Sequence, residues 1–286
     1  MKTLREVLAD ADARHVAVGH FNISELAALN GIFEAARELG LPVLIGVSEG
    51  ERAFIGVRTA VALIKNLREA YDYPIFLNAD HTHSIDKAKE AAEAGFDEII
   101  FDGSKLPLEE NIQQTAEAVK LIRAVNPNIV IEGEIGYIGS SSEIIAERPE
   151  ASLMLSTSEE AARFVTETGV DVLAPAVGNM HGLLKEMVTG DVHKRLDIPR
   201  IMDIKKACGK FMTLHGGSGT ADEDLAAAAK AGMTIIHISS ELRLAWRRGV
   251  EQGLLDPNEI APYKILAPSV AGIQKIVADR LKLFNG

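Results

Sequence analysis

The chain has 286 residues, of which 47% are hydrophobic and 25% are charged, a balance that excludes disordered, collagen-like and coiled-coil chains. Acidic residues outnumber basic ones by 41 to 30, for a formal charge of -11, so the average field repels nucleic acids and anionic lipids. We therefore expect no nucleic-acid or membrane partner, while a small phosphorylated metabolite stays possible. The single cysteine and the charged opening of the chain favour a cytoplasmic protein.

Short apolar runs alternate with longer amphipathic segments along the whole chain, which is typical of buried parallel strands and their covering helices. We predict eight strands, at residues 16–20, 42–47, 74–79, 97–101, 129–133, 171–176, 211–214 and 233–238. The amphipathic segments include residues 25–39, 58–69, 85–94, 109–124, 159–168 and 223–231. Eight such units predict a (β/α)8 barrel (TIM barrel), with an open doubly wound sheet as the alternative.

Two of the predicted helices have start signals, because Thr157 with Glu160 and Thr220 with Glu223 have the spacing of a capping box. No linker or low-complexity segment divides the chain, so we expect a single barrel domain over residues 1–286. Within it, residues 258–286 form a C-terminal helical extension suited to subunit contacts. The loops at 136–156 and 177–200 are long, and long loops after strands build the functional face of a barrel.

Three predicted strands run into a histidine at their carboxyl ends. The third ends in Asp80 and His81, the sixth leads to His181, and the seventh leads to His215. In a barrel these ends meet at one mouth, and three histidines with an open position are typical of catalytic zinc. The alternative is a coincidental set of surface histidines that only make hydrogen bonds.

Acidic residues accompany these histidines. Glu132 and Glu134 are two residues apart on the fifth strand and therefore face the same side, into the barrel or its mouth. Together with Asp102 after the fourth strand, they are suited to orienting a metal ligand or to binding a second ion. A salt bridge to a lysine inside the barrel is the alternative.

The last two strand ends carry a candidate phosphate site. Gly216, Gly217 and Ser218 follow the seventh strand, and Ser239 and Ser240 follow the eighth. Glycines let backbone N–H groups approach an anion, hydroxyls donate further bonds, and barrels commonly bind phosphate in these two loops. Each segment alone is equally typical of an ordinary loop and an ordinary helix cap.

At this point the chain resembles the class II, metal-dependent fructose-bisphosphate/tagatose-bisphosphate aldolase family over nearly its whole length. The resemblance rests on five motifs in the family's order: Asn78-Ala79-Asp80-His81, Phe101-Asp102-Gly103-Ser104, Glu132-Gly133-Glu134-Ile135-Gly136, Gly178-Asn179-Met180-His181-Gly182 and His215-Gly216-Gly217-Ser218-Gly219. It implies a lyase of carbohydrate metabolism (glycolysis) that holds one Zn²⁺ per subunit, takes a sugar-phosphate substrate and forms a homodimer or homotetramer.

The resemblance also implies roles for individual residues. Asp80 would be the general acid/base, and His81, His181 and His215 would bind the zinc ion. Glu134 would lie near the metal, with Asp102 and Glu132 as supporting carboxylates. The phosphate cradle would consist of Gly182, Gly216, Ser218, Ser239 and Ser240, and some of its carbonyl groups would hold a monovalent cation, Na⁺ or K⁺.

The chain departs from the family pattern at two places. In the stretch 136–143 that follows the fifth strand, Glu143 is the one carboxylate where relatives have an acidic pair, so Glu143 is the candidate second acid/base. His237 stands where many relatives have an asparagine that touches the substrate, which leaves tagatose 1,6-bisphosphate or another ketose phosphate open beside fructose 1,6-bisphosphate. Lys185 and Arg243 are candidates for a distal phosphate and are equally typical of surface charges. Asn22 could reach the mouth or simply form a turn.

Three other interpretations remain. A Schiff-base aldolase needs a lysine on the sixth strand, which carries none. A metal hydrolase is favoured by the pair His81 and His83, but such a pair normally lies on the first strand and would leave the glycine-rich loops unexplained. A catalytically silent sugar-phosphate binder, or a stabilising subunit of another aldolase, is favoured by the altered fifth loop and by His237.

Overall fold

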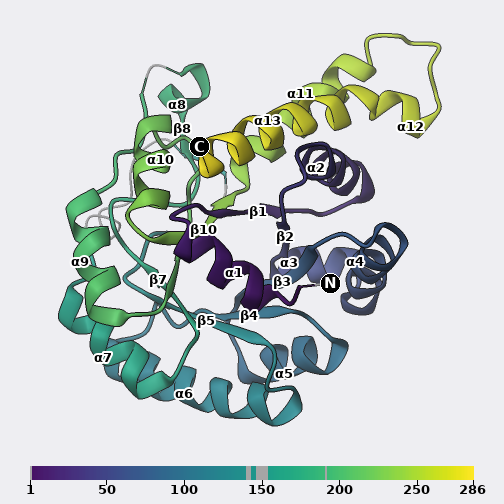
Figure 1. Cartoon of the computed structure of the whole chain (residues 1–286). Helices are drawn as coiled ribbons and strands as arrows, with labels where there is room; N and C mark the ends of the chain where they lie inside the picture. Colours follow the sequence, from purple (N-terminus) through teal and green to yellow (C-terminus); the bar gives the residue numbers. More distant parts are fainter. Residues whose placement is uncertain (1, 140–142, 146–153, 191) are drawn as a thin grey trace.

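The computed structural model describes residues 2–139, 143–145, 154–190 and 192–286. Eight parallel strands close into a barrel in the order β1-β10-β9-β7-β5-β4-β3-β2, which confirms the predicted barrel and excludes the open sheet (Figure 1). The strands are β1 (Val18–Asn22), β2 (Val43–Val47), β3 (Ile75–Thr82), β4 (Glu98–Phe101), β5 (Val130–Ile135), β7 (Val172–Pro175), β9 (Phe211–Leu214) and β10 (Met233–Ile238). Because β1 and β3 run further than predicted, Asn22, Asp80 and His81 are strand residues.

Helices surround the barrel. They are α1 (Leu4–Ala13), α2 (Leu26–Leu39), α3 (Glu49–Ile55), α4 (Val57–Tyr71), α5 (Ile85–Ala94), α6 (Leu108–Val125), α7 (Ser158–Thr168), α8 (Lys185–Thr189), α9 (Ile198–Cys208), α10 (Asp222–Lys230), α11 (Ser240–Gly253), α12 (Pro262–Ile265) and α13 (Ala267–Asn285). In the described part of the chain, none of them is long and apolar enough to span a bilayer.

One of the two predicted capping boxes is present. Thr157 accepts from the backbone N–H of Glu160, whose side chain bonds back to Thr157. The other prediction was wrong, because α10 begins after Ala221 and has no side-chain cap. Thr220 therefore lies one residue before the N-cap, Ala221, and its backbone forms an isolated parallel bridge with Lys194.

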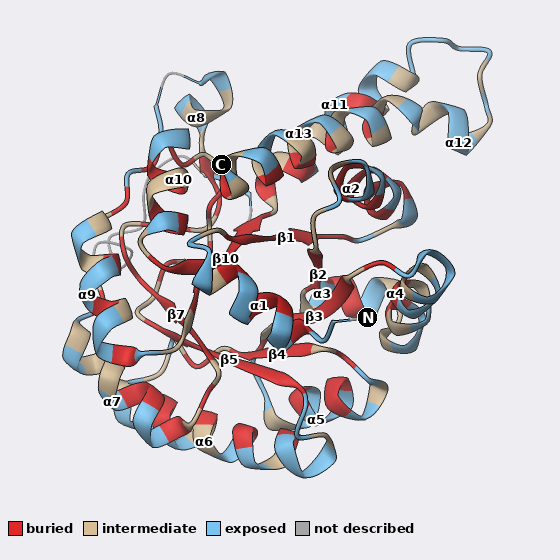
Figure 2. Cartoon of the chain, in the orientation of Figure 1, coloured by how far each residue is buried: buried red, intermediate tan, exposed pale blue. Residues whose placement is uncertain are grey.

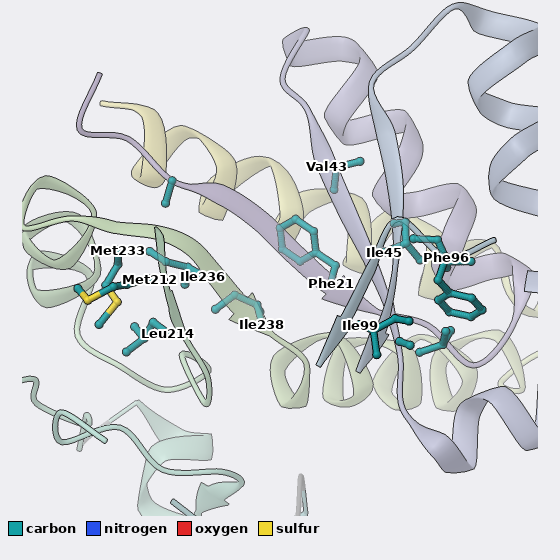
Figure 3. Packing of buried hydrophobic residues seen from close by; sticks show 14 of the residues in the cluster. Phe21, Val43, Ile45, Phe96, Ile99, Met212, Leu214, Met233, Ile236 and Ile238 are labelled. Atoms are coloured by element: carbon teal, nitrogen blue, oxygen red, sulfur yellow. The ribbon is translucent and has the colours of Figure 1, made fainter. Parts of the chain in front are cut away.

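The alternation of side chains along each strand separates an outer core from the barrel interior. Outward-facing residues such as Phe21, Ile45 and Ile99 pack with the covering helices in the larger hydrophobic cluster (Figure 3). Figure 2 shows the barrel strands mostly buried and the helices exposed on their outer side. Inward positions near the carboxyl ends are polar instead, and they include His20, Asn78 and Glu132.

The opposite end of the barrel is closed by α1, which the sequence analysis did not predict. Its Leu4, Val7, Leu8 and Ala11 form a second hydrophobic cluster with the first inward residue of several strands. Those strand residues are Val18, Leu44, Phe76, Val130, Val172 and Ile235. The barrel is therefore apolar at this end and polar toward the other.

The C-terminal helices lie along the outside of the barrel. Helix α13 packs against α2, α11 and β1, and its Ile273, Val277 and Leu281 are buried. Figure 1 shows α11 and α13 side by side, projecting beyond the barrel to α12. At the other side, the long loops after β5 and β7 pair through the short parallel strands β6 (Ile144–Ile145) and β8 (Leu183–Leu184).

Candidate metal and substrate site

A cavity of about 260 Å³ opens where the strands end. Many of the predicted site residues line it: Asn22, Asp80, His81, Asp102, His181, Gly182, Gly216, Ser218, His237, Ser239, Ser240 and Arg243. Glu132, Glu134 and His215 lie just beneath and are buried. Strand ends far apart in the sequence therefore bring one group of polar side chains together, as the barrel topology requires.

The three predicted histidine ligands lie together. Each of His81, His181 and His215 places one ring nitrogen near the same point, and these three nitrogen atoms lie within 4.8 Å of one another. His215 Nδ1 is 3.2 Å from His81 Nε2, and the ring centroids of His81 and His181 are 4.8 Å apart. This spacing suits three nitrogen ligands around one small divalent cation.

Hydrogen bonds at the opposite ring nitrogens determine which nitrogen of each histidine faces this centre. His81 Nδ1 donates to Asp102 Oδ2 at 2.9 Å, and His181 Nδ1 donates to the carbonyl of Gly139 at 2.7 Å. His215 Nε2 lies 2.7 Å from Glu132 Oε1. These partners leave His81 Nε2, His181 Nε2 and His215 Nδ1 as the nitrogens that face the centre, in the arrangement that orients metal-binding histidines.

The backbone of His81 is unusual. Its φ of 40° lies in the left-handed region, which is rare for a residue with a side chain, and the register between β3 and β4 shifts between Ala79 and Thr82. Arg52 holds this segment, because its guanidinium donates to the carbonyl of Asp80 at 3.2 Å and to Thr82 Oγ1 at 3.1 Å. The irregular backbone lets the consecutive residues Asp80 and His81 both line the cavity.

Buried carboxylates control the charge of the histidines. Burial acts to lower the pKa of His81, but Asp80, Asp102 and Glu134 raise it to about 10. Burial and the charge of His81 lower the pKa of His181 to about 4, and they also lower the pKa of His215. One positive charge therefore belongs to His81, and a cation bound at its Nε2 would displace a proton.

Glu132 and Glu134 face inward, as predicted, and among the described residues they pair with His81 and His215 rather than with a lysine. Glu134 Oε2 lies 3.6 Å from His81 Nδ1 and 3.7 Å from His215 Nδ1. Burial and neighbouring carboxylates raise the pKa of both glutamates well above the ordinary value. Glu134 Oε2 is buried and accepts no hydrogen bond from the described residues. This surplus of buried carboxylates favours a cation in the cluster.

Asp80 has one occupied and one open oxygen. Asn22 donates to Oδ2 at 2.8 Å, whereas Oδ1 is buried and has no hydrogen-bond donor among the described residues. Burial acts to raise the pKa of Asp80, but His81, His20 and His215 outweigh it, and with the bond from Asn22 they lower the pKa below the ordinary value. Asp80 is therefore an ionised carboxylate with one oxygen open to accept a proton.

A stack of imidazole rings extends this site into the barrel. His237 lies between His20, with centroids 3.5 Å apart, and His215, with centroids 4.2 Å apart. Its Nδ1 is 3.8 Å from Asp80 Oδ1. Gly46 makes room for the stack, because a Cβ there would lie 2.1 Å from the ring of His20. Sequence analysis missed His20, although its spacing of two from Asn22 puts both on the inward face.

The candidate phosphate cradle joins two loops. Ser218 Oγ accepts from the backbone N–H of Ser239 at 3.2 Å and from that of Glu241 at 3.3 Å. Gly217 packs against β10, with its N–H bonded to the carbonyl of His237, and is not among the residues that line the cavity in the described ranges. Sequence analysis also missed Lys194, which lines the cavity and donates to four backbone carbonyls.

Three other predicted residues lie in different surroundings. Glu143 and Lys185 are exposed, and neither is among the described residues that line the cavity. Arg243 lines it but pairs with Glu51 at 2.7 Å, and Glu51 in turn accepts from Asn22 at 3.0 Å. Ser140, Ser141 and Ser142, which follow Gly139 in the fifth loop, are outside the described residues.

Comparison with known proteins identifies relatives along the whole chain. The family model for class-II fructose-bisphosphate aldolase matches residues 2–286. The fructose-bisphosphate aldolase of Geobacillus stearothermophilus is 31% identical over 287 residues, which cover 99% of this chain and 96% of the relative. The fructose-bisphosphate aldolase of Staphylococcus aureus strain COL is also 31% identical, over 288 residues, with coverages of 99% and 96%.

Solved structures with the same fold include other aldolases. The YdjI aldolase from Escherichia coli K12 superimposes with a TM-score of 0.83 at 25% identity, covering 98% of this chain and 96% of that one. The fructose-bisphosphate aldolase of Campylobacter jejuni gives a TM-score of 0.79 at 20% identity, with coverages of 99% and 94%, and at that identity it supports the fold alone. From the family match and the relatives together, the chain belongs to the class II fructose-bisphosphate aldolase family and is an aldolase, a carbon–carbon lyase.

Proposed function

We propose that this protein is a zinc-dependent aldolase that reversibly cleaves a ketose 1,6-bisphosphate, first of all fructose 1,6-bisphosphate, into dihydroxyacetone phosphate and glyceraldehyde 3-phosphate. Class II aldolases depend in general on a metal ion. The observation that carries the proposal is the open oxygen of Asp80, beside three histidines whose lone pairs face one centre. Three histidines with an open position are the ligand set of catalytic zinc.

His81, His181 and His215 would hold the ion, with Glu134 beside them. A bound divalent cation would stabilise the negative charge that develops on the substrate oxygens when the C3–C4 bond breaks. In the cleavage direction Asp80 Oδ1 accepts the proton of the C4 hydroxyl, and in condensation it returns that proton to the aldehyde oxygen. Asn22 fixes the orientation of the carboxylate through Oδ2.

The remaining polar groups of the cavity fit the two ends of the substrate. Gly182, Gly216, Ser218, Ser239 and Ser240 would bind one phosphate, and Arg243 or Lys185 would bind the other. Glu143 remains our candidate for the second acid/base, which must handle the proton at C3. Its backbone carbonyl accepts from Leu183 at 3.0 Å, only two residues after His181.

One observation favours a second candidate substrate. His237 lines the cavity next to Asp80, so an imidazole faces the region where the C4 hydroxyl would bind. We therefore keep tagatose 1,6-bisphosphate, or another ketose phosphate that differs at C4, as the alternative. A catalytically silent sugar-phosphate binder is the alternative of a different class, which an assay of turnover excludes or supports.

We propose that residues 1–286 form one domain, with residues 258–286 as its helical extension. We further propose that the protein is cytoplasmic and forms a homodimer or homotetramer. The paired helices α11 and α13 project from the barrel, and their end exposes Leu254, Leu255, Ile260 and Tyr263. Exposed apolar side chains of this size favour a contact between subunits.

The proposal is tested by a coupled assay for dihydroxyacetone phosphate released from fructose 1,6-bisphosphate, run with EDTA and after zinc is restored. We expect turnover that EDTA abolishes and zinc restores. Asp80→Ala should retain zinc and lose turnover by about 10²- to 10⁴-fold, whereas Asp203→Ala on the exposed face of α9 should leave both unchanged. His215→Ala should lower zinc occupancy.

Two results would contradict the proposal. Full activity of Asp80→Ala would remove it from the mechanism, and unchanged zinc content in His215→Ala would remove that residue from the ligand set. A zinc-loaded protein that turns over tagatose 1,6-bisphosphate but not fructose 1,6-bisphosphate would favour the alternative substrate. A protein that binds these sugars tightly but cleaves none would favour the silent binder.

A further inference from the structure

The ammonium group of Lys194 is held by four backbone carbonyl oxygens. Its Nζ donates to Met180 O and Gly182 O, each at 2.7 Å, to Gly216 O at 3.0 Å and to Ser218 O at 2.6 Å. Lys194 is 2% exposed. In proteins an array of carbonyl oxygens replaces the hydration shell of a bound monovalent cation. Here the cation among these oxygens is the ammonium group of Lys194. We refer to these four oxygens as the carbonyl cage.

The cage requires a cation or a hydrogen-bond donor at its centre. An ammonium group has three N–H donors and no acceptor, so it fits a set of neighbours that are all acceptors, with one N–H shared between two of the four carbonyl oxygens. The two loops approach closely, because a Cβ on Gly216 would lie 2.3 Å from Met180 O. Carbonyl dipoles that point at one another across such a gap repel each other unless a cation or a donor lies between them.

The four peptide groups of the cage also connect the loops around the cavity. Each carbonyl that faces Lys194 belongs to a peptide whose N–H points the other way and is bonded there. His181 N donates to Ile138 O and Leu183 N to Glu143 O. Gly217 N donates to His237 O, and Gly219 N donates to Glu241 Oε1. Lys194 thus lies at the centre of a network that joins the loops after β5, β7, β9 and β10.

The cage adjoins both parts of the proposed site. Met180 directly precedes His181, Gly216 directly follows His215, and Gly182, Gly216 and Ser218 belong to the phosphate cradle. Lys194 is fixed in this place by its own backbone, since its N–H donates to Gly219 O at 2.9 Å and its carbonyl accepts from Ala221 at 3.2 Å. A charge at this point orients two candidate metal ligands and favours an anion in the cradle.

We propose that Lys194 is a built-in cation that occupies the carbonyl cage in place of a soluble Na⁺ or K⁺ ion. It is a positioning residue, because it acts through the backbone of the cradle loops, and it makes the cradle independent of monovalent cations. The statement about phosphate binding rests on the function proposed above. The statement about cation binding does not, because the cage can be tested without any substrate.

The first experiment needs no catalysis and begins with the wild-type protein. Binding of Tl⁺, which resembles K⁺ in size and charge, is measured by thallium-205 NMR, and the melting temperature is measured in KCl and in tetramethylammonium chloride of equal concentration. We expect no saturable Tl⁺ site in the wild-type protein and the same melting temperature in both salts. Lys194→Ala, which removes the ammonium and leaves the cage, should gain a saturable Tl⁺ site and melt higher in KCl.

The second experiment measures the affinity for inorganic phosphate by calorimetry. In tetramethylammonium chloride, Lys194→Ala should bind phosphate at least about tenfold more weakly than the wild-type protein, the equivalent of one lost charge-assisted interaction. KCl should restore much of this affinity. Lys194→Met fills the space with an uncharged side chain, so KCl should not restore it. Lys206→Met, on the exposed face of α9, is the matched control and should behave as the wild-type protein.

A saturable Tl⁺ site in the wild-type protein, or a phosphate affinity that depends on K⁺ there, would overturn the proposal, and both results remain available if the Lys194 variants fail to fold. Phosphate affinity that is unchanged in Lys194→Met would also overturn it. These outcomes are distinct from a failure of the proposed aldolase activity, which would show as absent turnover in a protein with an intact, cation-independent cage.

Discussion

Replacing Asp102 by asparagine should weaken metal binding through His81 while leaving the size of the side chain unchanged. Asp102 Oδ2 accepts from His81 Nδ1 at 2.9 Å. This bond keeps a proton on Nδ1, so Nε2 is the nitrogen that gives up its proton when a metal ion binds. Burial acts to raise the pKa of Asp102, but its bond to His81 and the bonds from Ser104 lower it well below the ordinary value. The group is therefore a carboxylate that only accepts.

The structure also determines how the asparagine of Asp102→Asn would be oriented. The other oxygen, Oδ1, accepts from the backbone N–H of Ser104 at 3.0 Å and from its hydroxyl at 2.6 Å. Because Ser104 offers two donors at the position of Oδ1, the amide of the new asparagine must place its oxygen there. Its NH₂ group must then face His81 Nδ1. His81 would then accept at Nδ1 and carry its proton at Nε2, where the metal ion should bind.

Loss of such a partner typically lowers metal affinity by 10- to 100-fold, which equals about 1.4 to 2.7 kcal/mol. The assay is competition for zinc with a chromophoric chelator at fixed pH, with circular dichroism to verify folding. Ser104→Ala is the control, because it removes a bond to Oδ1 and leaves the bond to His81, so its zinc affinity should stay close to that of the wild-type protein. Zinc affinity of Asp102→Asn within about twofold of the wild-type value would refute the reasoning.

Two further predictions concern stability. Burial raises the pKa of Tyr73 to about 12, and the Tyr73 hydroxyl donates to Leu41 O. In the unfolded chain a tyrosine loses this proton near pH 10. The contribution of Tyr73 to stability therefore falls as the pH rises from about 10 to about 12. Between about pH 10 and pH 12 the unfolding free energy of Tyr73→Phe, measured with urea, should therefore fall by about 1 to 2 kcal/mol less than that of the wild-type protein. Equal decreases in the two proteins would contradict the raised pKa of Tyr73. Leu8 on α1 is fully buried at the closed end of the barrel. Leu8→Ala should therefore lower the unfolding free energy by about 2.7 to 5 kcal/mol and leave kcat/KM of the folded protein unchanged. A decrease below about 1 kcal/mol would show that α1 does not close the barrel.

The fold could be predicted because its signals are local. Each strand and helix carries its period within a few residues, and eight repeats of one unit leave few alternatives to a closed barrel. The errors have different causes. Thr220 has the sequence of a helix cap, but the helix begins one residue later, and the backbone of Thr220 bridges to Lys194. Helix α1 was missed although its signals are local, namely a capping box at Thr3 and Glu6 and one apolar face; only its role, to close the barrel, depends on strands from the entire chain.

Some features of the candidate site could be predicted from the sequence, and others could not. His81, His181 and His215 follow strands, and the carboxyl ends of parallel strands in a barrel meet at one face, so the sequence alone could group them. The stacking of His237 on His20 and the open oxygen of Asp80 depend on how side chains pack between strands, which no single segment determines.

Lys194 shows most clearly what only the tertiary structure decided. In the sequence it is one lysine in a long loop, 12 to 24 residues away from the four carbonyl groups that it meets. The backbone of a loop has no period, and carbonyl groups carry no residue identity, so no sequence pattern marks their convergence. Residue types at strand ends thus determined the class of chemistry, whereas the folded loops decided which charges and oxygen atoms surround it.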